Sequence, residues 1–305
     1  MINGGYGVSS PPAAAGGGYS FTWADATARM AQAVTSNEFG QRGYQQDMQL
    51  GYEAVEDGAG GFRWARLNDP RVVMRRGLFP VNNAANFTVD GLATAAPTTP
   101  LGSGVSARNA SAGTNKATRQ TRAGLATVAG AGNRASCRFG GSDAANNPLV
   151  PTAGFRSRVA TVLNNTSANA SWTTMAFGDA LFGGAANPNA QTNVLAMGRF
   201  AQANLQIYCN DAAGLCTEQD CGASFPAITQ GEGYELEVFT WDGTEWVAQV
   251  TRVNTGDAFS ATFSSNLPAA AQGGFGWFVN NVGDAASINA TDIVYWIGEY
   301  FNVSP

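Results

Sequence analysis

From residue 136 to its end, the chain is a succession of short apolar runs separated by glycine, asparagine and proline. None of these runs has the length or the apolar spacing of a long amphipathic helix. Short runs bounded by turn residues are typical of β-strands, so this punctuation predicts an all-β antiparallel sandwich or barrel. Strands are expected at 136–139, 155–163, 172–177, 193–200, 204–209, 217–222, 234–241, 244–253, 258–263, 274–279 and 292–300.

The clearest local signal is the dipeptide Asp242-Gly243, which separates two of these runs. Aspartate followed by glycine readily adopts the positive φ angles of a two-residue type I′ turn. Such a turn places Phe239 opposite Trp246 in the hairpin, where the two side chains form a matched apolar pair.

The first 20 residues are mostly glycine, proline, alanine and serine, with isolated apolar residues at Ile2, Tyr6 and Val8. A segment of this composition has too little apolar surface to fold alone. We predict an extended arm over 1–20 that anchors the protein to its neighbours through these three residues; a free tail is the alternative. This segment also lacks the basic and apolar regions of a signal peptide.

A small attachment element is expected over 21–79. The alanine-rich run 24–34 suits one short helix, with Thr22 and Asp25 as its capping box. Short strand-like runs follow at 43–47, 51–56 and 62–67.

Residues 80–135 are rich in alanine, glycine, threonine and asparagine, and they predict a linker followed by one or two edge strands. The domain boundary is therefore placed at residue 80, and 80–305 is assigned to the sandwich.

Composition excludes several classes of function. Only 13% of the residues are charged and the net charge is −5, so the chain lacks the dense basic face that binds nucleic acid. The chain contains no apolar stretch of about 18 residues, so no membrane span is predicted. The chain has no histidine, which removes Ser-His-Asp triads, Cys-His pairs and histidine-ligated metal sites. We predict no catalytic residue, no cofactor and no metal site.

The missing histidine leaves calcium binding and glycoside cleavage open, because neither needs it. The loop 280–284 offers asparagine and aspartate oxygens to calcium, but these residues are also ordinary turn formers, and turn roles are expected. Glu235 and Glu237 lie two apart on one strand and share a face, as a glycosidase pair could. The Glu-x-Asp-x-x-Glu signature of jelly-roll glucanases is missing, since Thr240 occupies the position where the second acid would be. Two solvent-facing glutamates are the expected reading.

Exposed tryptophans suggest a glycan contact instead. Trp241 flanks the predicted turn, and Trp277 lies in a strand with Phe275 and Val279 on the same side. A flat aromatic side chain at the rim of a sandwich can stack on a sugar ring, although aromatic residues in strands more often belong to the core.

The C-terminal two-thirds resembles a family of phage virion proteins with a concanavalin-like jelly-roll domain. The residues that carry the resemblance lie, in order, at 118–132, 204–226, 234–239, 252–256, 265–268 and 293–301. The cysteines and the tryptophan-rich hairpin depart from that family. A shorter likeness to the small β elements near the N-termini of phage fibres involves Glu38, Gly40, Gln45, Asp47, Trp64 and Leu67.

The resemblance implies a jelly-roll sandwich, a place on the exterior of a phage particle after synthesis in the host cytoplasm, and no chemistry. The expected protein is therefore a structural appendage (a tail fibre, head fibre or capsid decoration) that contacts other virion proteins through its arm and can contact host-surface carbohydrate. Head and tail are left open. A carbohydrate-active hydrolase on the same fold is the alternative function.

The hairpin around residues 211–214 is expected to place Cys209 directly opposite Cys216. A disulfide would need local closure of the strands, and assembly in a reducing cytoplasm favours two free thiols. Cys137 and Cys221 are expected to be unpaired.

The closing strand predicts an oligomer, because both of its faces are apolar. One face carries Val294, Trp296 and Tyr300, and the other carries Ile293, Tyr295, Ile297 and Phe301. A strand with one wet face should alternate apolar with polar residues, so the second face should be covered. The cover is either the chain's own N-terminal segment or a neighbouring subunit. Phage appendages of this resemblance are usually threefold, which implies a homotrimer.

Overall fold

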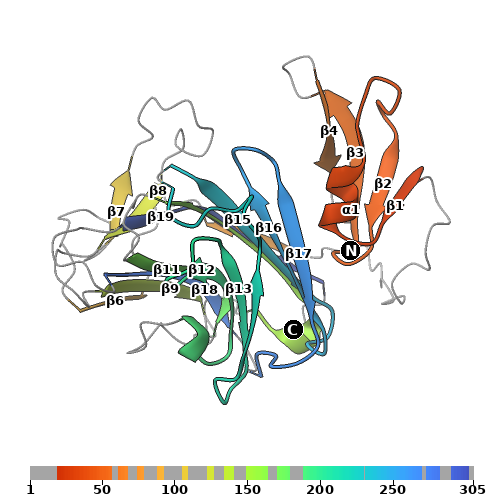
Figure 1. Cartoon of the computed structure of the whole chain (residues 1–305). Helices are drawn as coiled ribbons and strands as arrows, with labels where there is room; N and C mark the ends of the chain where they lie inside the picture. Colours follow the sequence, from red (N-terminus) through yellow and green to blue (C-terminus); the bar gives the residue numbers. More distant parts are fainter. Residues whose placement is uncertain are drawn as a thin grey trace, which may run out of the picture. The chain divides into compact units, whose positions relative to one another are not determined.

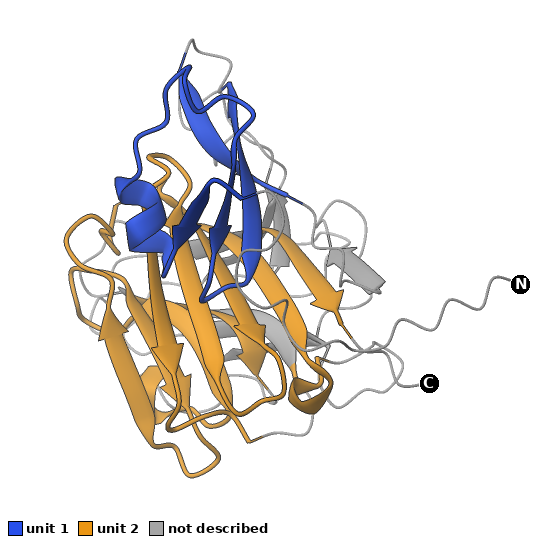
Figure 2. Cartoon of the chain, turned by 90° about the vertical axis from the view of Figure 1, so that its right-hand side faces the viewer, with its two compact units in different colours: residues 1–69 blue, residues 70–305 orange. Residues whose placement is uncertain are grey.

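A computed structural model of the chain describes residues 19–56, 61–67, 74–78, 88–92, 105–108, 122–126, 134–140, 149–163, 170–178, 188–229, 231–269, 273–281 and 290–301. The predicted arm lies outside these residues, except for its last two. The chain forms two compact units, Met1–Asp69 and Pro70–Pro305 (Figure 2). The units divide before the boundary placed at residue 80, because strand β5 (Met74–Leu78) pairs with strand β19 (Ala290–Tyr300) of the second unit.

The first unit is a four-stranded sheet with one short helix, α1 (Ala26–Ala31). Its strands are, in spatial order, β1 (Phe21–Trp23), β2 (Arg42–Gln45), β3 (Leu50–Glu56) and β4 (Phe62–Arg66). The pair β1–β2 is parallel, which the sequence did not indicate, and the other pairs are antiparallel. The helix begins later than expected: Asp25 is its N-cap and accepts a hydrogen bond from Ala28 N at 2.8 Å.

Aromatic side chains form the core of the first unit. The six-membered ring of Trp23 lies against Gly43, where an added Cβ atom would come within 1.8 Å of it, so only glycine fits beside this tryptophan. Trp64 meets the Trp23 ring edge-on at 4.8 Å, and the buried Arg29 lies 4.3 Å over the ring of Tyr52. The helix thus closes one face of the sheet over the large side chains.

The second unit is an antiparallel jelly-roll sandwich, as predicted (Figure 1). One sheet has the order β17-β16-β15-β10-β19-β8-β7, with β5 also paired to β19, and the other has the order β14-β13-β12-β11-β18-β9-β6. The strands not yet given are β6 (Thr88–Leu92), β7 (Val105–Arg108), β8 (Arg122–Ala126), β9 (Arg134–Gly140), β10 (Phe155–Leu163), β11 (Ala170–Gly178), β12 (Val194–Arg199), β13 (Gln206–Asn210), β14 (Cys216–Asp220), β15 (Gly233–Thr240), β16 (Trp246–Arg252), β17 (Ala258–Phe263) and β18 (Gly274–Asn281).

Two short 3-10 helices, Pro151–Ala153 and Pro188–Ala190, accompany these strands. The region 80–135 was expected to give one or two edge strands. Its strands β6 and β7 lie at the ends of the sheets, whereas β8 lies between β19 and β7.

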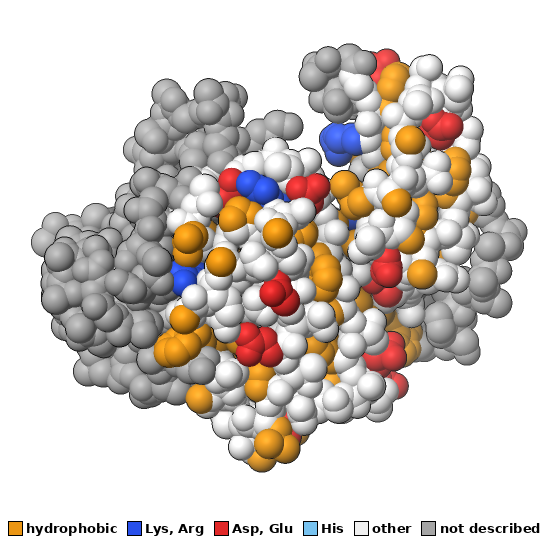
Figure 3. All heavy atoms as spheres, in the orientation of Figure 1, with side chains coloured by type: hydrophobic (Ala, Val, Ile, Leu, Met, Phe, Trp, Pro, Cys, Tyr) orange, Lys and Arg blue, Asp and Glu red, His pale blue; other side chains and the backbone are white. Residues whose placement is uncertain are grey.

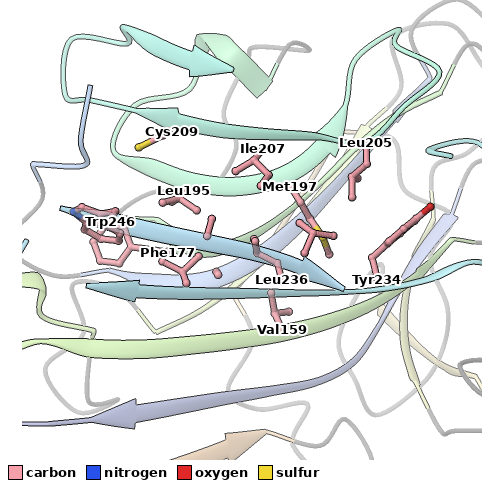
Figure 4. Close-up of a cluster of buried hydrophobic side chains, with 14 of the residues drawn as sticks. Val159, Phe177, Leu195, Met197, Leu205, Ile207, Cys209, Tyr234, Leu236 and Trp246 are labelled. Carbon is pink, nitrogen blue, oxygen red and sulfur yellow. The ribbon is translucent and has the colours of Figure 1, made fainter. Parts of the chain in front are cut away.

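The core of the sandwich lies between the sheets and consists of alternate residues from each strand. Leu195 and Ile207 of the seven-stranded sheet face Leu236 and Trp246 of the eight-stranded sheet (Figure 4). All four side chains are buried. Alternation along each strand therefore sends the intervening residues to the outer faces of the sandwich.

The register of the β15–β16 hairpin differs from the prediction by one residue. Phe239 pairs with Val247, and Thr240 pairs with Trp246, so Phe239 and Trp246 lie on opposite faces. Gly243 has a φ of 85°, but Asp242 is not among the residues with positive φ, so a type I′ turn does not form. The Asp242 carboxylate instead accepts hydrogen bonds from the Thr244 amide and hydroxyl, which lengthens the loop.

The β13–β14 hairpin is also displaced by one residue. Cys209 pairs with Thr217, and Cys216 pairs with Asn210, so the two cysteines lie on opposite faces of the sheet. The cause is again an aspartate: Asp211 Oδ1 accepts hydrogen bonds from the amides of Ala213 and Leu215, which keeps Leu215 in the loop. Cys209, Cys216 and Cys221 are free thiols, and the side chain of Cys137 lies outside the described residues.

Strand β19 contains a β-bulge that the sequence pattern did not reveal. Ala160 pairs with Tyr295 but Thr161 pairs with Ile293, so Val294 is the extra residue. Val294 therefore packs with Ala160 and Tyr295 on the outer face, whereas Trp296 and Tyr300 enter the main core. The assignment of Val294 to the face of Trp296 was wrong.

Candidate functional site

Glu235, Glu237 and Trp241, which the sequence singled out, belong to a group of charged and aromatic residues at the outer face of the eight-stranded sheet. Val159 of β10 points into the core, so Arg156 and Arg158 point outward. The register sets Arg156 between Glu299 of β19 and Phe239 of β15. Strands that are distant in the sequence thus bring opposite charges and aromatic rings together.

Arg156 is the centre of a buried group that we call the Arg156 cluster: Arg156, Glu237, Phe239, Glu299 and Phe301. The guanidinium lies 3.3 Å from a Glu237 oxygen and 3.0 Å from a Glu299 oxygen. It also lies over the rings of Phe239 and Phe301, at 5.2 and 5.3 Å from their centres. All five residues are at most 8% exposed. The cluster is a desolvated ion-pair network with aromatic walls.

This burial corrects the reading of Glu235 and Glu237 as two solvent-facing glutamates. Glu237 is only 3% exposed, because Arg156 takes up its carboxylate. Glu235 remains partly exposed, and its carboxylate lies 3.9 Å from the Arg158 guanidinium. Each carboxylate therefore faces an arginine of β10, and the buried one is closed to a substrate.

Trp241 also has a different position from the one expected. It is half-buried, and it stacks on Phe301 with 5.5 Å between the ring centres and lies 6.4 Å from Phe239. The residue after β19 supplies this partner, which no local pattern could indicate. Trp277 pairs through its backbone with Thr174 and Cys137, and its side chain lies outside the described residues.

A second charged group joins two segments that carry the family resemblance. Arg252 donates to both oxygens of Glu232 at 2.8 Å and to the carbonyl of Ser224 at 2.9 Å. The Asn254 amide donates to the same glutamate at 2.7 Å. The Glu232 contact raises the pKa of Arg252. This group fastens the loop after β14 to the end of the β15–β16 hairpin.

The outer face of the seven-stranded sheet carries buried polar groups. Tyr208 is fully buried opposite Glu218, and desolvation raises its pKa. Asn210 donates to the carbonyls of Pro188 and Gln191, which places the 3-10 helix at 188–190 against β13. Desolvation also raises the pKa of Glu218, which accepts a hydrogen bond from Gln202 at 2.8 Å. These contacts tie a loop to the sheet.

The predicted arm residues Ile2, Tyr6 and Val8 and most of the candidate calcium loop 280–284 lie outside the described part of the chain. Among the residues that are described, no group of three or more metal-binding side chains occurs. Within the same part of the chain, no helix has the length and apolar character to cross a membrane. On the face in Figure 3, acidic, basic and apolar side chains of the described residues are interspersed.

Comparison with known proteins found similar structures only. No family model matches the chain, and no curated protein matches its sequence. Lectin II from Ulex europaeus is 12% identical with a TM-score of 0.45, over 75% of this chain and 98% of the lectin. The CBM2 module of the evolved Dit of Lactobacillus casei BL23 phage J-1 is 11% identical with a TM-score of 0.44, over 75% and 96%.

A carbohydrate esterase from the Shiga toxin-encoding bacteriophage phi24B is 12% identical with a TM-score of 0.42, over 73% of this chain and 96% of the esterase. Likenesses at this level are remote, so the fold assignment rests on the strand order and pairing of this chain itself.

Proposed function

We propose that the chain is a non-enzymatic structural component of a bacteriophage particle, a fibre or decoration appendage on the exterior of the tail or capsid. One observation carries the proposal: residues in the segments that resemble phage virion proteins hold the framework of the sandwich. Arg252 fastens Glu232 and Ser224, and Asn266 donates to Thr217 at 3.0 Å. A resemblance carried by framework residues such as these is expected when relatives share a scaffold.

The N-terminal element supports the same proposal. Glu38 accepts hydrogen bonds from the Thr35 amide and hydroxyl at 2.8 and 2.6 Å. Asp47 accepts from the Gln45 side chain and from the Met48 amide, at 2.7 and 2.6 Å. Residues that resemble phage-fibre elements thus stabilise the loops of a compact unit that follows the predicted arm in the sequence.

Particle attachment through the arm is tested by deleting residues 1–20. We expect the shortened protein to fold, since the described strands and core lie after this segment. It loses one backbone hydrogen bond, from Ser20 to the Arg42 carbonyl, and the contact of the exposed Tyr19 ring with Tyr44. It should fail to join particles when it is supplied in place of the full chain during phage assembly. Normal incorporation of the shortened protein would contradict attachment through Ile2, Tyr6 and Val8.

The appendage itself is tested by its copy number. Quantitative mass spectrometry of purified particles should find the chain in a fixed multiple of a symmetric site, as decorations and fibres are. Its absence from washed particles would contradict the proposal. The homotrimer that the resemblance implies stays a prediction from the sequence. The closing strand no longer requires it, because Arg156 and Trp241 of this chain pack on Phe301 at the end of that outer face, and Phe301 is only 8% exposed.

A carbohydrate hydrolase is the second candidate, favoured only by Glu235 and Glu237 on one strand. Burial of Glu237 against Arg156 argues against it. The test is release of reducing ends from host-surface polysaccharide by the purified protein, compared with its Glu235→Gln variant. Cleavage that the substitution abolishes would establish the hydrolase and overturn the non-enzymatic role.

Contact with a host glycan is a separate part of the proposal. The contact residues expected from the sequence are Trp241 and Trp277, and Trp241 is half-buried. Binding of host polysaccharide by the wild type, weakened at least fivefold by Trp241→Leu, would support the contact. Equal binding by both proteins would remove Trp241 from it.

A further inference from the structure

Strand β17 ends the eight-stranded sheet, and it differs from the other strands at the ends of the two sandwich sheets. It pairs with β16 on one side, and no described strand pairs with its other side (Figure 1). The other end strands carry charged residues, namely Glu218 and Asp220 in β14, Asp90 in β6 and Arg108 in β7. Charges of this kind prevent edge-to-edge pairing. The sequence of β17, Ala-Phe-Ser-Ala-Thr-Phe, has none.

The pattern of β17 is also the same when it is read in either direction about Ala261. Phe259 and Phe263 flank it on the core face, where Phe263 is buried and Phe259 packs against the core at 6.4 Å from Phe225. Ser260 and Thr262 flank it on the outer face, and Thr262 is exposed. Such a strand is self-complementary.

We propose that a second copy of the chain pairs with this edge, antiparallel to it and related by a twofold axis at Ala261. An axis perpendicular to the sheet keeps core-facing residues opposite core-facing residues. Phe259 then lies opposite Phe263 of the second copy, Ala261 opposite Ala261, and Ser260 opposite Thr262. Aromatic pairs and hydroxyl pairs are among the favourable cross-strand neighbours.

The absence of charged residues from β17 also favours a second copy of this chain as its partner. An isologous contact places every residue opposite a residue of the same surface, so an edge with carboxylates, such as β14, would bring like charges together. The uncharged β17 avoids this repulsion, and its backbone groups gain hydrogen bonds along the whole strand. The contact does not rest on the proposed function. It gives an even number of copies, unlike the implied homotrimer.

Light scattering on the purified full chain is the first test. We expect a mass of twice 31.6 kDa. The Thr262→Lys variant should have the monomer mass with an unchanged circular dichroism spectrum, because two lysines then lie at the paired edges. Gln219→Lys, at an exposed position of β14, is the matched control and should keep the mass of the wild type.

A monomeric wild type would overturn the proposal. So would a threefold mass that Thr262→Lys leaves unchanged, a result that would favour the homotrimer and leave the virion role untouched.

Disulfide cross-linking tests the register of the paired β17 strands. It also tests the dimer itself if a lysine variant fails to fold. Mild oxidation should link the Ala261→Cys chain into a disulfide dimer, because the two residues lie at the axis. Ala258→Cys is the control, since its two copies would be about 20 Å apart. Mixing the Thr262→Lys chain with the Ser260→Glu chain should restore the dimer mass. Linkage of both cysteine variants to the same extent, or of neither, would overturn the register.

Discussion

The three described cysteines show how burial controls the chemistry of single residues. Desolvation raises the pKa of Cys216 to about 11, and it also raises the pKa of the more deeply buried Cys209 and Cys221. Cys209 donates its thiol hydrogen to the Asn266 carbonyl at 3.5 Å. Because the thiolate is the reactive form, these residues are expected to be inert at neutral pH.

This expectation can be measured by alkylation with iodoacetamide. At pH 8, Cys216 in the folded protein should react on the order of a hundredfold more slowly than in denaturant, where its pKa returns to about 8.5. The rate should increase as the pH rises toward 11, since a raised pKa moves thiolate formation to higher pH. Equal rates in the folded and denatured protein would contradict the burial of this thiol.

The Arg252 group makes a prediction about stability. Lysine at 252 keeps the charge but lacks the forked guanidinium that serves both oxygens of Glu232 and the Ser224 carbonyl. Arg252→Lys should therefore lower the free energy of unfolding by about 1–3 kcal/mol in urea denaturation. The control is Arg42→Lys at an exposed ion pair with Glu53, where a change below about 0.5 kcal/mol is expected. Equal losses of unfolding free energy in both variants would show that the forked contacts of Arg252 do not contribute more stability than an exposed ion pair.

At the scale of elements, loop chemistry determines the register of the hairpins. Thr240 Oγ1 accepts a hydrogen bond from the Gly243 amide and donates to the Glu245 carbonyl, and these bonds close the loop before β16. Together with the Asp242 hydrogen bonds, they make the loop longer than two residues, and every pair in the hairpin is displaced with it.

Two loop glycines allow a controlled comparison. Gly243 and Gly256 have φ angles of 85° and 83°, a region that disfavours other residues. Gly256→Ala should cost about 1 kcal/mol from the backbone alone, because no atom lies within 4 Å of the added Cβ. Gly243→Ala should cost more, since its Cβ would lie 3.1 Å from Pro151. Urea denaturation of both variants gives the order, and a larger loss at Gly256 would contradict the structure.

At the scale of the whole molecule, the division into two compact units predicts separate sensitivity to damage. Gly43→Ala introduces a Cβ within 1.8 Å of the buried Trp23 ring, so the first unit should lose its fold. The sandwich contains no part of that contact and should stay folded. Limited proteolysis of the variant should therefore degrade 1–69 and leave a stable fragment that begins near residue 70. Degradation of the whole chain at one rate would contradict independent folding.

Local pattern by itself determined the class of fold and the position of most sandwich strands. β10 and β17 begin and end where the sequence predicts, because residues that favour turns flank each of them. Strand existence depends on side-chain alternation and on turn formers, and both are local properties. The same reasoning placed one short helix in the N-terminal unit. The expected capping box of Thr22 and Asp25 was wrong, because Asp25 itself is the N-cap.

Register, faces and partners were decided only by the tertiary structure. The aspartate-based loops displaced two hairpins by one residue, and a bulge moved Val294 to the other face. The candidate site followed the same rule. Glu237 and Trp241 were found from the sequence, but Arg156 was missed, and Phe301 was not recognised as its neighbour. The reason is that strands β10, β15 and β19 are brought together by pairing over long distances in the chain. A sequence pattern shows which face a residue prefers, whereas the neighbour that buries it depends on how the sheets close.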